Sequence, residues 1–325
     1  MMTMVQALNS ALRAVLAEDD RVLVLGQDIG ELGGVFRVTD GLRKDFGADR
    51  VVDSLLAESS IVGTAIGLAL RGYRPVCEIQ FDGFVYPAFN QIVSQLAKLH
   101  ERTRGRVRLP VVIRIPAGGG IGAVEHHSES NEAYFAHTAG LRVVYCSDAN
   151  DAHWMLRQAV RSDDPVIFYE PKRRYWAKAE VAAAQDPARV LPLDRARVAR
   201  PGRDLTLLSY GGMIQVCLDA AETAASEGHE LEVIDLRSLS PLDTPTLVAS
   251  VIRTRRAVVV HEAPTFLGLG SELAAQITER CFYHLEAPVL RVGGYNLPYP
   301  PARLEDHYLP DIDRVLAAVD RALAF

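Results

Sequence analysis

The chain has 325 residues, of which 49% are apolar and 23% are charged, with a formal net charge of −6. This composition is typical of a globular protein of about two domains and is too apolar for a disordered chain. The acidic balance argues against a nucleic-acid partner, and the lack of any apolar run of about 18 residues argues against a membrane span. With no signal-peptide pattern and four widely spaced cysteines, we expect a cytoplasmic protein whose cysteines are buried apolar residues.

The apolar pattern alternates between short strands and helices along the chain. In the first half we predict helices over residues 5–18, 55–71, 86–101 and 150–161, and strands over 21–25, 74–81, 109–115 and 165–169. No clear period runs through 171–202. Beyond it we predict strands over 205–209, 231–235, 257–261 and 289–292, and helices over 213–227, 246–254, 271–283 and 312–323.

This order of elements predicts an α/β fold with parallel sheets covered on both faces, because continuous apolar strands separated by helices form such sheets. We expect a first domain over residues 1–185, a linker over 186–200 and a smaller α/β domain over 201–325.

A glycine-rich stretch, Gly118–Ala123, follows one predicted strand. It formally fits the G-x-G-x-x-A pattern of dinucleotide-binding folds, but no helix starts at once, so we disfavour that interpretation. A flexible loop whose glycines adopt positive φ is a simpler interpretation of this stretch. We favour a loop whose backbone approaches a ligand, because the polar cluster Glu125–Glu129 comes next. Taken alone, that cluster is better explained by a solvated polar loop, and no HExxH or CxxC pattern supports zinc.

Glu58 stands near the predicted start of a very apolar helix. It is either an ordinary first-turn acid, favoured there by the helix dipole, or a buried carboxylate held for chemistry. Gly63 and Gly67 lie on the same helix, and each costs a helix about 1 kcal/mol. They therefore predict close packing, against a neighbour in this chain or at a subunit interface.

Several colinear stretches resemble one known family over essentially the whole length. They are Met2–Ala7, Gly33–Arg37, Leu56–Ser59, Glu78–Phe84, His127–Ser130, Asp235–Leu239, Pro241–Asp243 and Glu286–Arg291. The chain resembles the beta subunit of the thiamine-diphosphate-dependent 2-oxo acid dehydrogenase component. This resemblance implies a transketolase-like pyrimidine-binding domain followed by a transketolase C-terminal-type domain. The stretches Ala123–Ser128, Glu170–Tyr175 and Pro298–Glu305 look most like branched-chain members of bacterial type.

The resemblance implies roles for four residues at the cofactor. Glu58 would bond the aminopyrimidine ring of thiamine diphosphate and promote activation of the cofactor, which supplies the hard chemistry. Gln80 and Phe84 would line that ring, with Phe84 stacking on it where relatives often carry Tyr. Leu56 would contact the same ring.

Two histidines and one glutamine complete the implied site. His127 would act at the substrate mouth when the acyl group passes to lipoyl-lysine, as proton donor or positioner. A shifted alignment would choose His126 instead. Gln27 stands where relatives usually have a Glu that is implicated in proton communication between two active sites. Because an amide cannot relay a proton as a carboxylate does, that coupling is in doubt here.

The resemblance also concerns metals and partners. It suggests a potassium ion held mostly by backbone carbonyls near Leu109, Val111, Ala159, Ser162 and Asp164. A Gly-Asp-Gly with a downstream Asn, which holds magnesium and the diphosphate, is missing, and Thr39-Asp40-Gly41 does not match it. The implied partners are an alpha subunit that holds magnesium, in an assembly of two alpha and two beta chains, and a dihydrolipoyl acyltransferase core. The C-terminal domain would pair beta with beta.

We therefore predict the beta subunit of a branched-chain 2-oxo acid dehydrogenase, active only with its alpha subunit. It would decarboxylate 2-oxo acids oxidatively and acylate lipoyl-lysine reductively. The same subunit for pyruvate or acetoin would keep all these motifs. A non-catalytic α/β binding or electron-transfer protein is an alternative of another class, and it would bind its ligand fully without a partner chain.

Overall fold

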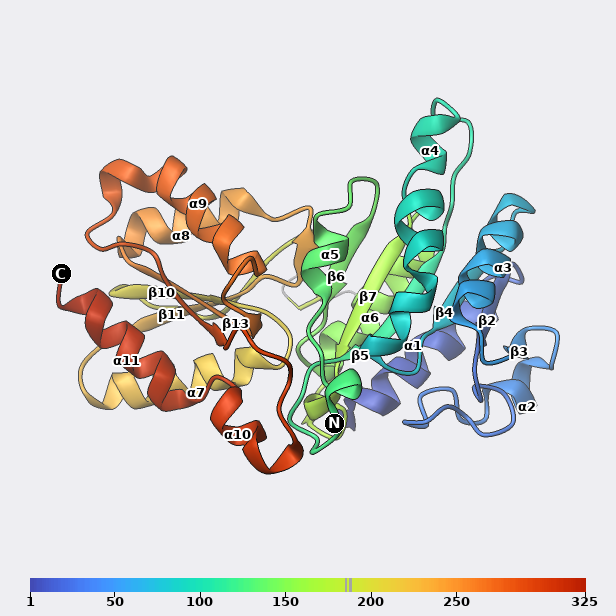
Figure 1. The fold of residues 1–325 in the computed structure, drawn as a ribbon, viewed down its shortest axis with the longest axis horizontal. Coiled ribbons are helices and arrows are strands. Elements are labelled where there is room, and N and C mark those ends of the chain that lie inside the picture. Colours follow the sequence, from blue (N-terminus) through green and yellow to red (C-terminus); the bar gives the residue numbers. More distant parts are fainter. Residues whose placement is uncertain (185, 187–188) are drawn as a thin grey trace.

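The computed structural model describes residues 1–184, 186 and 189–325 and shows two α/β halves side by side (Figure 1). The helices are α1 Met4–Glu18, α2 Leu42–Phe46, α3 Glu58–Leu70, α4 Leu99–Arg102, α5 Glu132–Ala136, α6 Ala149–Arg161, α7 Met213–Ser226, α8 Thr244–Thr254, α9 Leu269–Cys281, α10 Glu305–Tyr308 and α11 Ile312–Leu323. The strands are β1 Met2–Thr3, β2 Val22–Gly26, β3 Val51–Asp53, β4 Arg74–Glu78, β5 Val112–Ala117, β6 Arg142–Tyr145, β7 Val166–Pro171, β8 Lys178–Ala179, β9 Arg197–Arg200, β10 Leu205–Ser209, β11 Leu231–Asp235, β12 Ser238–Ser240, β13 Ala257–Pro264 and β14 Leu290–Gly294.

A seven-stranded sheet organises the first half of the described chain. Its strand order is β12-β6-β7-β5-β4-β2-β3, and every pair is parallel except β12 with β6. Helices α1 and α6 cover one face, where Leu12 and Met155 share a core with Val112. Helix α3 covers the other face, where Val62 packs in a core with Ile113. Both faces are buried, as the continuous apolar strands predict.

A smaller sheet of five strands organises the second half. Its order within the described residues is β14-β13-β10-β11-β9, parallel except for the edge strand β9. Helices α7 and α11 lie on one face, and α8 and α9 lie on the other (Figure 1). The predicted α/β class is therefore confirmed for both halves.

The helix predicted over 86–101 is wrong as a single element. The chain instead forms a 3₁₀ helix at Asp82–Ala88, a π-helical turn at Gln91–Leu96 and then α4. Pro87 explains the break, because proline has no N–H to donate and its ring clashes with the preceding turn of a regular α-helix.

The segment between the halves differs in part from the prediction. Residue 185, the expected end of the first domain, and positions 187 and 188 of the expected linker lie outside the described residues. Residues 197–200, placed in that linker, form β9 and pair antiparallel with β11. This strand is short and only half-buried, so it lacks the apolar run that marks a central strand.

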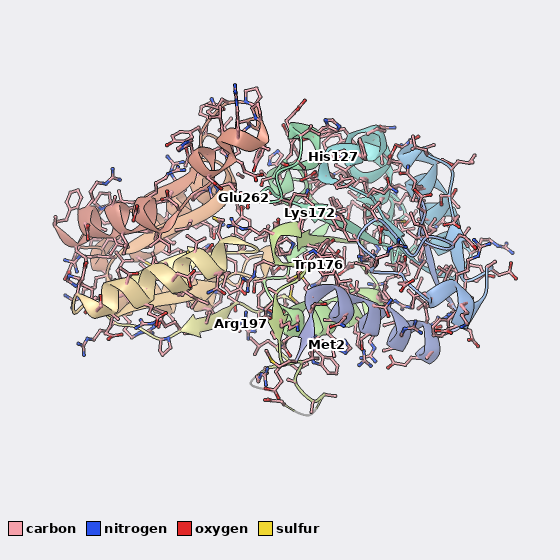
Figure 2. The ribbon with its side chains drawn as sticks, turned by 90° about the horizontal axis from the view of Figure 1, so that it is seen from below. Met2, His127, Lys172, Trp176, Arg197 and Glu262 are labelled. Carbon is pink, nitrogen blue, oxygen red and sulfur yellow. The ribbon has the colours of Figure 1, made fainter. Side chains whose placement is uncertain are left out.

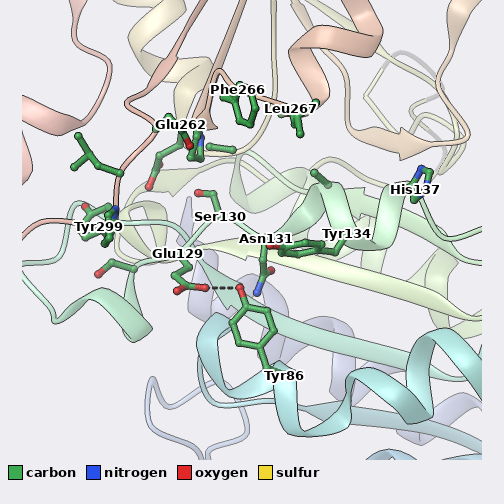
Figure 3. Close-up of a pocket in the computed structure, with 18 of the residues that line it drawn as sticks. Tyr86, Glu129, Ser130, Asn131, Tyr134, His137, Glu262, Phe266, Leu267 and Tyr299 are labelled. Atoms are coloured by element: carbon green, nitrogen blue, oxygen red, sulfur yellow. Dashed lines mark hydrogen bonds between the residues drawn. The ribbon is translucent and has the colours of Figure 1, made fainter.

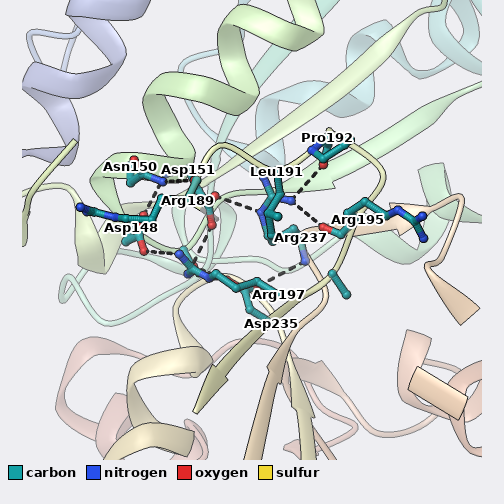
Figure 4. Close-up of polar contacts among 12 residues, drawn as sticks. Asp148, Asn150, Asp151, Arg189, Leu191, Pro192, Arg195, Arg197, Asp235 and Arg237 are labelled. Atoms are coloured by element: carbon teal, nitrogen blue, oxygen red, sulfur yellow. Dashed lines mark hydrogen bonds and ion pairs between the residues drawn. The ribbon is translucent and has the colours of Figure 1, made fainter. Parts of the chain in front are cut away.

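The second half also supplies a strand to the first sheet. Strand β12 pairs with β6, with Ser238 opposite Val144. Beside it, the fully buried Arg237 donates from Nε to Asp151 at 3.0 Å, and Arg197 donates to Asp148 at 2.9 Å (Figure 4). Strand pairing and these ion pairs thus join the two halves.

All four cysteines are buried. In the described part of the chain, no helix combines the length and the apolar character that a membrane crossing requires.

Candidate functional site

The carboxyl ends of the parallel strands β2, β4, β5 and β7 meet at one edge of the larger sheet. Ligands of open α/β sheets bind at this edge, where the loops diverge. Gln27, Gly118 and Lys172 directly follow β2, β5 and β7, Gln80 stands two residues after β4, and the buried Gln27 contacts Glu58 at the start of α3. The sequence-predicted residues therefore lie on the edge where a site is expected.

Glu58 is buried, with 8% of its surface exposed. The buried Gln27 donates from Nε2 to Glu58 Oε1 at 3.0 Å, whereas Glu58 Oε2 accepts no hydrogen bond from the described residues. The Oε1 atom of Gln27 is also buried and has no partner there. One carboxylate oxygen is thus held in place while the other stays available to a ligand.

A second group consists of aromatic rings around His127. The imidazole of His127 stacks on Phe81, with centroids 4.0 Å apart and planes within 4°. Phe84 meets His127 edge-on at 5.0 Å, and His126, which is exposed, lies 4.4 Å from His127. A side chain on Gly83 would collide with the His126 carbonyl oxygen, so this glycine is required for the close approach.

An ion pair lies next to this aromatic group. Lys172 Nζ is 3.0 Å from Asp82 Oδ2, both side chains are fully buried, and Nζ lies 5.6 Å from the centroid of the Phe81 ring. Burial raises the pKa of Asp82 to about 7, although Lys172 acts in the opposite direction. Burial also lowers the pKa of Lys172. The pair lies next to His127, because the Phe81 ring contacts both Lys172 and His127, which Figure 2 labels.

Gln80 and Leu56 border the Gln27–Glu58 pair, because Gln80 Nε2 donates to the Gln27 carbonyl at 3.5 Å and Leu56 stands two residues before Glu58. Gln80 is half-buried and donates to Asp28 Oδ2 at 3.1 Å. Leu56 is 83% exposed and its neighbour Leu55 is 87% exposed. Two adjacent exposed leucines are typical of a surface that a ligand or another chain covers. In the described structure no hydrogen bond joins Glu58 to His127, so the site consists of two separate groups on one edge.

Sequence reasoning missed three features: the Gln27–Glu58 hydrogen bond, the stacking of Phe81 on His127, and the Asp82–Lys172 pair. The stretches that carry the resemblance already included Phe81, Asp82 and Lys172, but no local pattern indicates their contacts. Such contacts depend on which strand ends become neighbours in the sheet.

A cavity of about 860 Å³ lies between the two halves (Figure 3). Tyr86 and Tyr134 line it from the first half, and Phe266, Leu267 and Tyr299 line it from the second. Its lining includes none of the predicted cofactor and catalytic residues, namely Leu56, Glu58, Gln80, Phe84 and His127. The cavity therefore adjoins the candidate site, through the residue after His127, without containing it.

The region of the expected potassium ion is already well hydrogen-bonded. Arg74 Nη1 donates to the carbonyls of Val160 and Ser162, each at 3.0 Å, and Arg142 donates to the Asp164 carboxylate at 2.9 Å. Val111 accepts from the Val166 amide at 2.9 Å. Among the residues that the structure describes, no group of three or more His, Cys, Asp or Glu side chains is arranged to hold a metal. Potassium binding stays a prediction.

Two family descriptions match the chain. "Transketolase, pyrimidine binding domain" matches residues 1–177, and "Transketolase, C-terminal domain" matches residues 194–315. A solved structure titled "Split gene transketolase, inactive beta4 tetramer" is similar in fold, with a TM-score of 0.79 and 24% identity, covering 99% of this chain and 98% of that one. The fold and the site thus define a transketolase-like protein with a pyrimidine-binding half.

Three curated relatives are similar over nearly their whole length. The "Pyruvate dehydrogenase E1 component subunit beta" of Leifsonia xyli subsp. xyli is 60% identical, with 99% of this chain and 95% of the relative covered. The "3-methyl-2-oxobutanoate dehydrogenase subunit beta" of Mycobacterium tuberculosis is 56% identical, with coverages of 99% and 92%. The "2-oxoisovalerate dehydrogenase subunit beta" of Pseudomonas aeruginosa is 46% identical, with coverages of 99% and 95%. The chain belongs to the thiamine-dependent 2-oxo acid dehydrogenase E1 beta subunits.

The residues present fit one end of thiamine diphosphate. An aminopyrimidine offers a polar edge and a flat face, and the chain offers the free oxygen of Glu58, the unpartnered Gln27 Oε1 and the ring of Phe84. For the diphosphate, the chain has neither a Gly-Asp-Gly nor, in its described part, a cluster of metal-binding side chains. The fit is therefore to the aminopyrimidine end alone.

Proposed function

We propose that this chain is the catalytic beta subunit of a branched-chain 2-oxo acid dehydrogenase that works together with an alpha subunit. The observation that carries the proposal is the buried Glu58 carboxylate, which Gln27 holds through one oxygen at the ligand-binding edge of the sheet. A carboxylate held in this way can bond a ring nitrogen without reorganising, which is how a preorganised group contributes to catalysis.

In this proposal the chain's own residues bind, orient and move protons. Thiamine diphosphate, when bound, supplies the electron sink that a 2-oxo acid needs in order to lose carbon dioxide. Glu58 holds a proton at the aminopyrimidine nitrogen, Gln27 fixes the direction of that carboxylate, and Phe84 packs its ring on the flat face. Leu56 and Gln80 border the same ring. His127 donates or accepts a proton when the acyl group passes to lipoyl-lysine.

The assignment of partners follows from what this chain lacks. Because the chain has no Gly-Asp-Gly, we assign magnesium and the diphosphate to the alpha subunit, in an assembly of two alpha and two beta chains. The exposed Leu55 and Leu56 before α3 support a partner at this surface. A dihydrolipoyl acyltransferase core receives the acyl group. We also propose a potassium ion near Ser162. We place the complex in the cytoplasm.

Two 2-oxo acid classes compete as substrate. The stretches Ala123–Ser128, Glu170–Tyr175 and Pro298–Glu305 favour a branched-chain acid, and two relatives at 56% and 46% identity carry names of that kind. A relative at 60% identity carries the name of a pyruvate dehydrogenase, which favours pyruvate as the second candidate.

The test compares steady-state rates with 3-methyl-2-oxobutanoate and with pyruvate, using the purified complex of alpha and beta chains with thiamine diphosphate and magnesium. We expect the higher kcat/KM with the branched-chain acid, and a higher value with pyruvate would overturn that choice. In the same complex, Glu58→Ala should largely abolish decarboxylation of either acid. Normal activity in that variant would contradict the role of Glu58.

The non-catalytic alternative makes a different prediction about the chain alone. We expect weak or no binding of thiamine diphosphate to the isolated beta chain, measured by calorimetry, and tight binding after the alpha chain is added. Full affinity without the alpha chain would favour a stand-alone binding protein.

A further inference from the structure

The glycine loop, residues 118–122, is surrounded by carboxylates of the same chain. The Gly118 amide donates to Asp82 at 3.1 Å, and the Gly119 amide donates to Glu262. The amides of Gly120 and Gly122 donate to the two oxygens of Glu305, at 2.8 and 2.9 Å.

The backbone of this loop is shaped to receive a negative group. Gly118, Gly120 and Gly122 have φ values of 80°, 81° and 69°, which glycine adopts readily and other residues rarely do. Successive amides in such conformations form a concave anion-binding surface. The expected approach of the loop backbone to a ligand is thus replaced by contact with Glu262 and Glu305 of the second half.

Glu305 is the residue best placed to fix the loop. It is the first residue of α10 and is only 6% exposed. Besides the two amides, the Tyr299 hydroxyl donates to Glu305 Oε1 at 2.6 Å. Hydrogen bonds to an ionised carboxylate are about twice as strong as neutral ones. Three donors therefore converge on one buried side chain that belongs to the second half of the chain.

The loop leads directly to the aromatic group of the candidate site. The 3₁₀ turn Glu125–His127 follows it within three residues, and the His127 amide closes this turn by donating to the Val124 carbonyl at 3.0 Å. The His126 carbonyl of this turn packs so closely on Gly83 that a Cβ atom there would collide with it. Because the turn is packed in this way and carries His127, we expect movement of the loop to shift the His127 ring on Phe81.

We propose that Glu305 is a positioning residue, through which the second half of the chain holds the glycine loop and so keeps His127 stacked on Phe81 for acyl transfer. The activity part of this inference rests on the proposed function. The structural part, the attachment of the loop by Glu305, does not.

The first measurement needs no activity. Hydrogen–deuterium exchange is followed in the alpha–beta complex for Glu305→Ala, Glu305→Gln and the matched control Asp306→Asn, an exposed neighbour on α10. We expect faster exchange across residues 118–127 in Glu305→Ala, an intermediate rate in Glu305→Gln, which keeps one acceptor oxygen, and the wild-type rate in Asp306→Asn. Unchanged exchange in Glu305→Ala would overturn the attachment.

The second measurement separates positioning from a general loss of stability. Decarboxylation with a dye acceptor and acylation of a lipoyl domain are measured for Glu305→Ala, His127→Ala and the double variant. Displacing a catalytic group by about 1 Å costs up to about 100-fold, so we expect acylation in Glu305→Ala to fall about tenfold or more while decarboxylation stays within about twofold.

In the His127→Ala background the further loss from Glu305→Ala should vanish, because coupled residues are not additive. An equal loss in both backgrounds, or equal losses in both half-reactions, would overturn the positioning role. A wild-type complex that decarboxylates no 2-oxo acid would instead contradict the proposed function and leave the exchange result standing.

Discussion

Gln27 lies 3.0 Å from Glu58, and its amide can donate a hydrogen bond but cannot take up a proton. An amide in place of a carboxylate at position 27 therefore changes the charge beside Glu58. With an amide, the pair carries one ionisable group, and the carboxylate is oriented without a neighbouring negative charge.

Gln27→Glu should make the stability of the chain depend more steeply on pH. Two carboxyls about 3 Å apart resist ionising together, so the folded pair retains a proton that the unfolded chain releases near pH 4. Stability present at low pH is then lost as pH rises from about 4 to 7, by roughly 1.4 kcal/mol for each unit by which the last ionisation is raised. Urea unfolding of the isolated chain at several pH values measures this loss.

Gln27→Met is the control for the Gln27→Glu variant, because it removes the same hydrogen bond without adding a charge. Its loss of stability relative to wild type should vary with pH much less than that of Gln27→Glu, because it adds no second carboxyl. Equal pH dependence in Gln27→Met and Gln27→Glu would contradict the shared proton.

His127 and His126 are neighbours in sequence but differ in environment, since the ring of His127 is stacked on Phe81 and that of His126 is exposed. His127→Ala should reduce acylation of a lipoyl domain by about 100-fold or more, the usual contribution of a general acid or base, and should affect decarboxylation less. His126→Ala should change both half-reactions by less than about threefold, as the surface position of the ring implies. Equal losses in both half-reactions for His127→Ala would count against its role in acyl transfer.

At the scale of elements, helix α3 carries two glycines, for which the sequence predicts close packing either within the chain or at a subunit interface. Gly63 and Gly67 are exposed, and a side chain at either would meet open space. Close packing against a neighbour in the same chain is therefore wrong, because these glycines face away from the sheet that the rest of α3 covers. A subunit interface is the interpretation that stays as a prediction.

Gly67→Ala should have opposite effects on the isolated chain and on the complex. Alone, α3 gains about 1 kcal/mol of helix propensity, so the Tm of the beta chain should rise. At a close interface the added methyl group should weaken assembly with the alpha chain, measured by sedimentation. Thr64→Ala, on the exposed side of the same helix, also favours the helix but removes bulk, so it should assemble normally. Normal assembly of Gly67→Ala would exclude an interface at this glycine.

The elements also show which parts of the fold the sequence predicts. Strands such as β4 and β10 were predictable because they are buried on both faces and are therefore continuously apolar. Strand β12 was not, since Ser238–Ser240 has no such run and pairs with β6, almost a hundred residues earlier in the chain. Strand β9 was missed for the same reason.

The candidate site shows the same division between local and long-range information. Glu58 and His127 stand in stretches that resemble the family, so they could be proposed from sequence. The hydrogen bonds of Glu305 to Gly120 and Gly122 span more than 180 residues and depend on how the two halves meet. No local pattern encodes such a contact.

At the scale of the whole molecule, a buried histidine in the second half limits the stability of the fold at low pH. His261 is fully buried, donates from Nδ1 to the Ala263 carbonyl at 2.9 Å, and has no partner for Nε2 among the described residues. Burial lowers the pKa of His261 to about 4. The unfolded chain, with an ordinary histidine near 6.5, binds more protons between these values.

The folded state should therefore lose stability as pH falls from about 6.5 to 4, by about 3 kcal/mol from this residue. His261→Leu should unfold with a shallower pH dependence over that range, as measured by urea titration of the isolated chain. His229→Gln, at an exposed position, should retain the wild-type slope. Identical slopes for wild type and His261→Leu would contradict a neutral, buried imidazole.

The strand β12 has a mechanical consequence. Hinge bending between two halves of a protein needs a junction of a few loop residues that absorb the rotation. Here, bending would separate Ser238 from Val144 and strip the buried Arg237 of Asp151, and breaking a buried ion pair alone costs about 3–5 kcal/mol. We therefore expect the two halves of the chain to move as one rigid body. Any opening and closing during turnover would then come from surface loops or from the movement of another chain against this one.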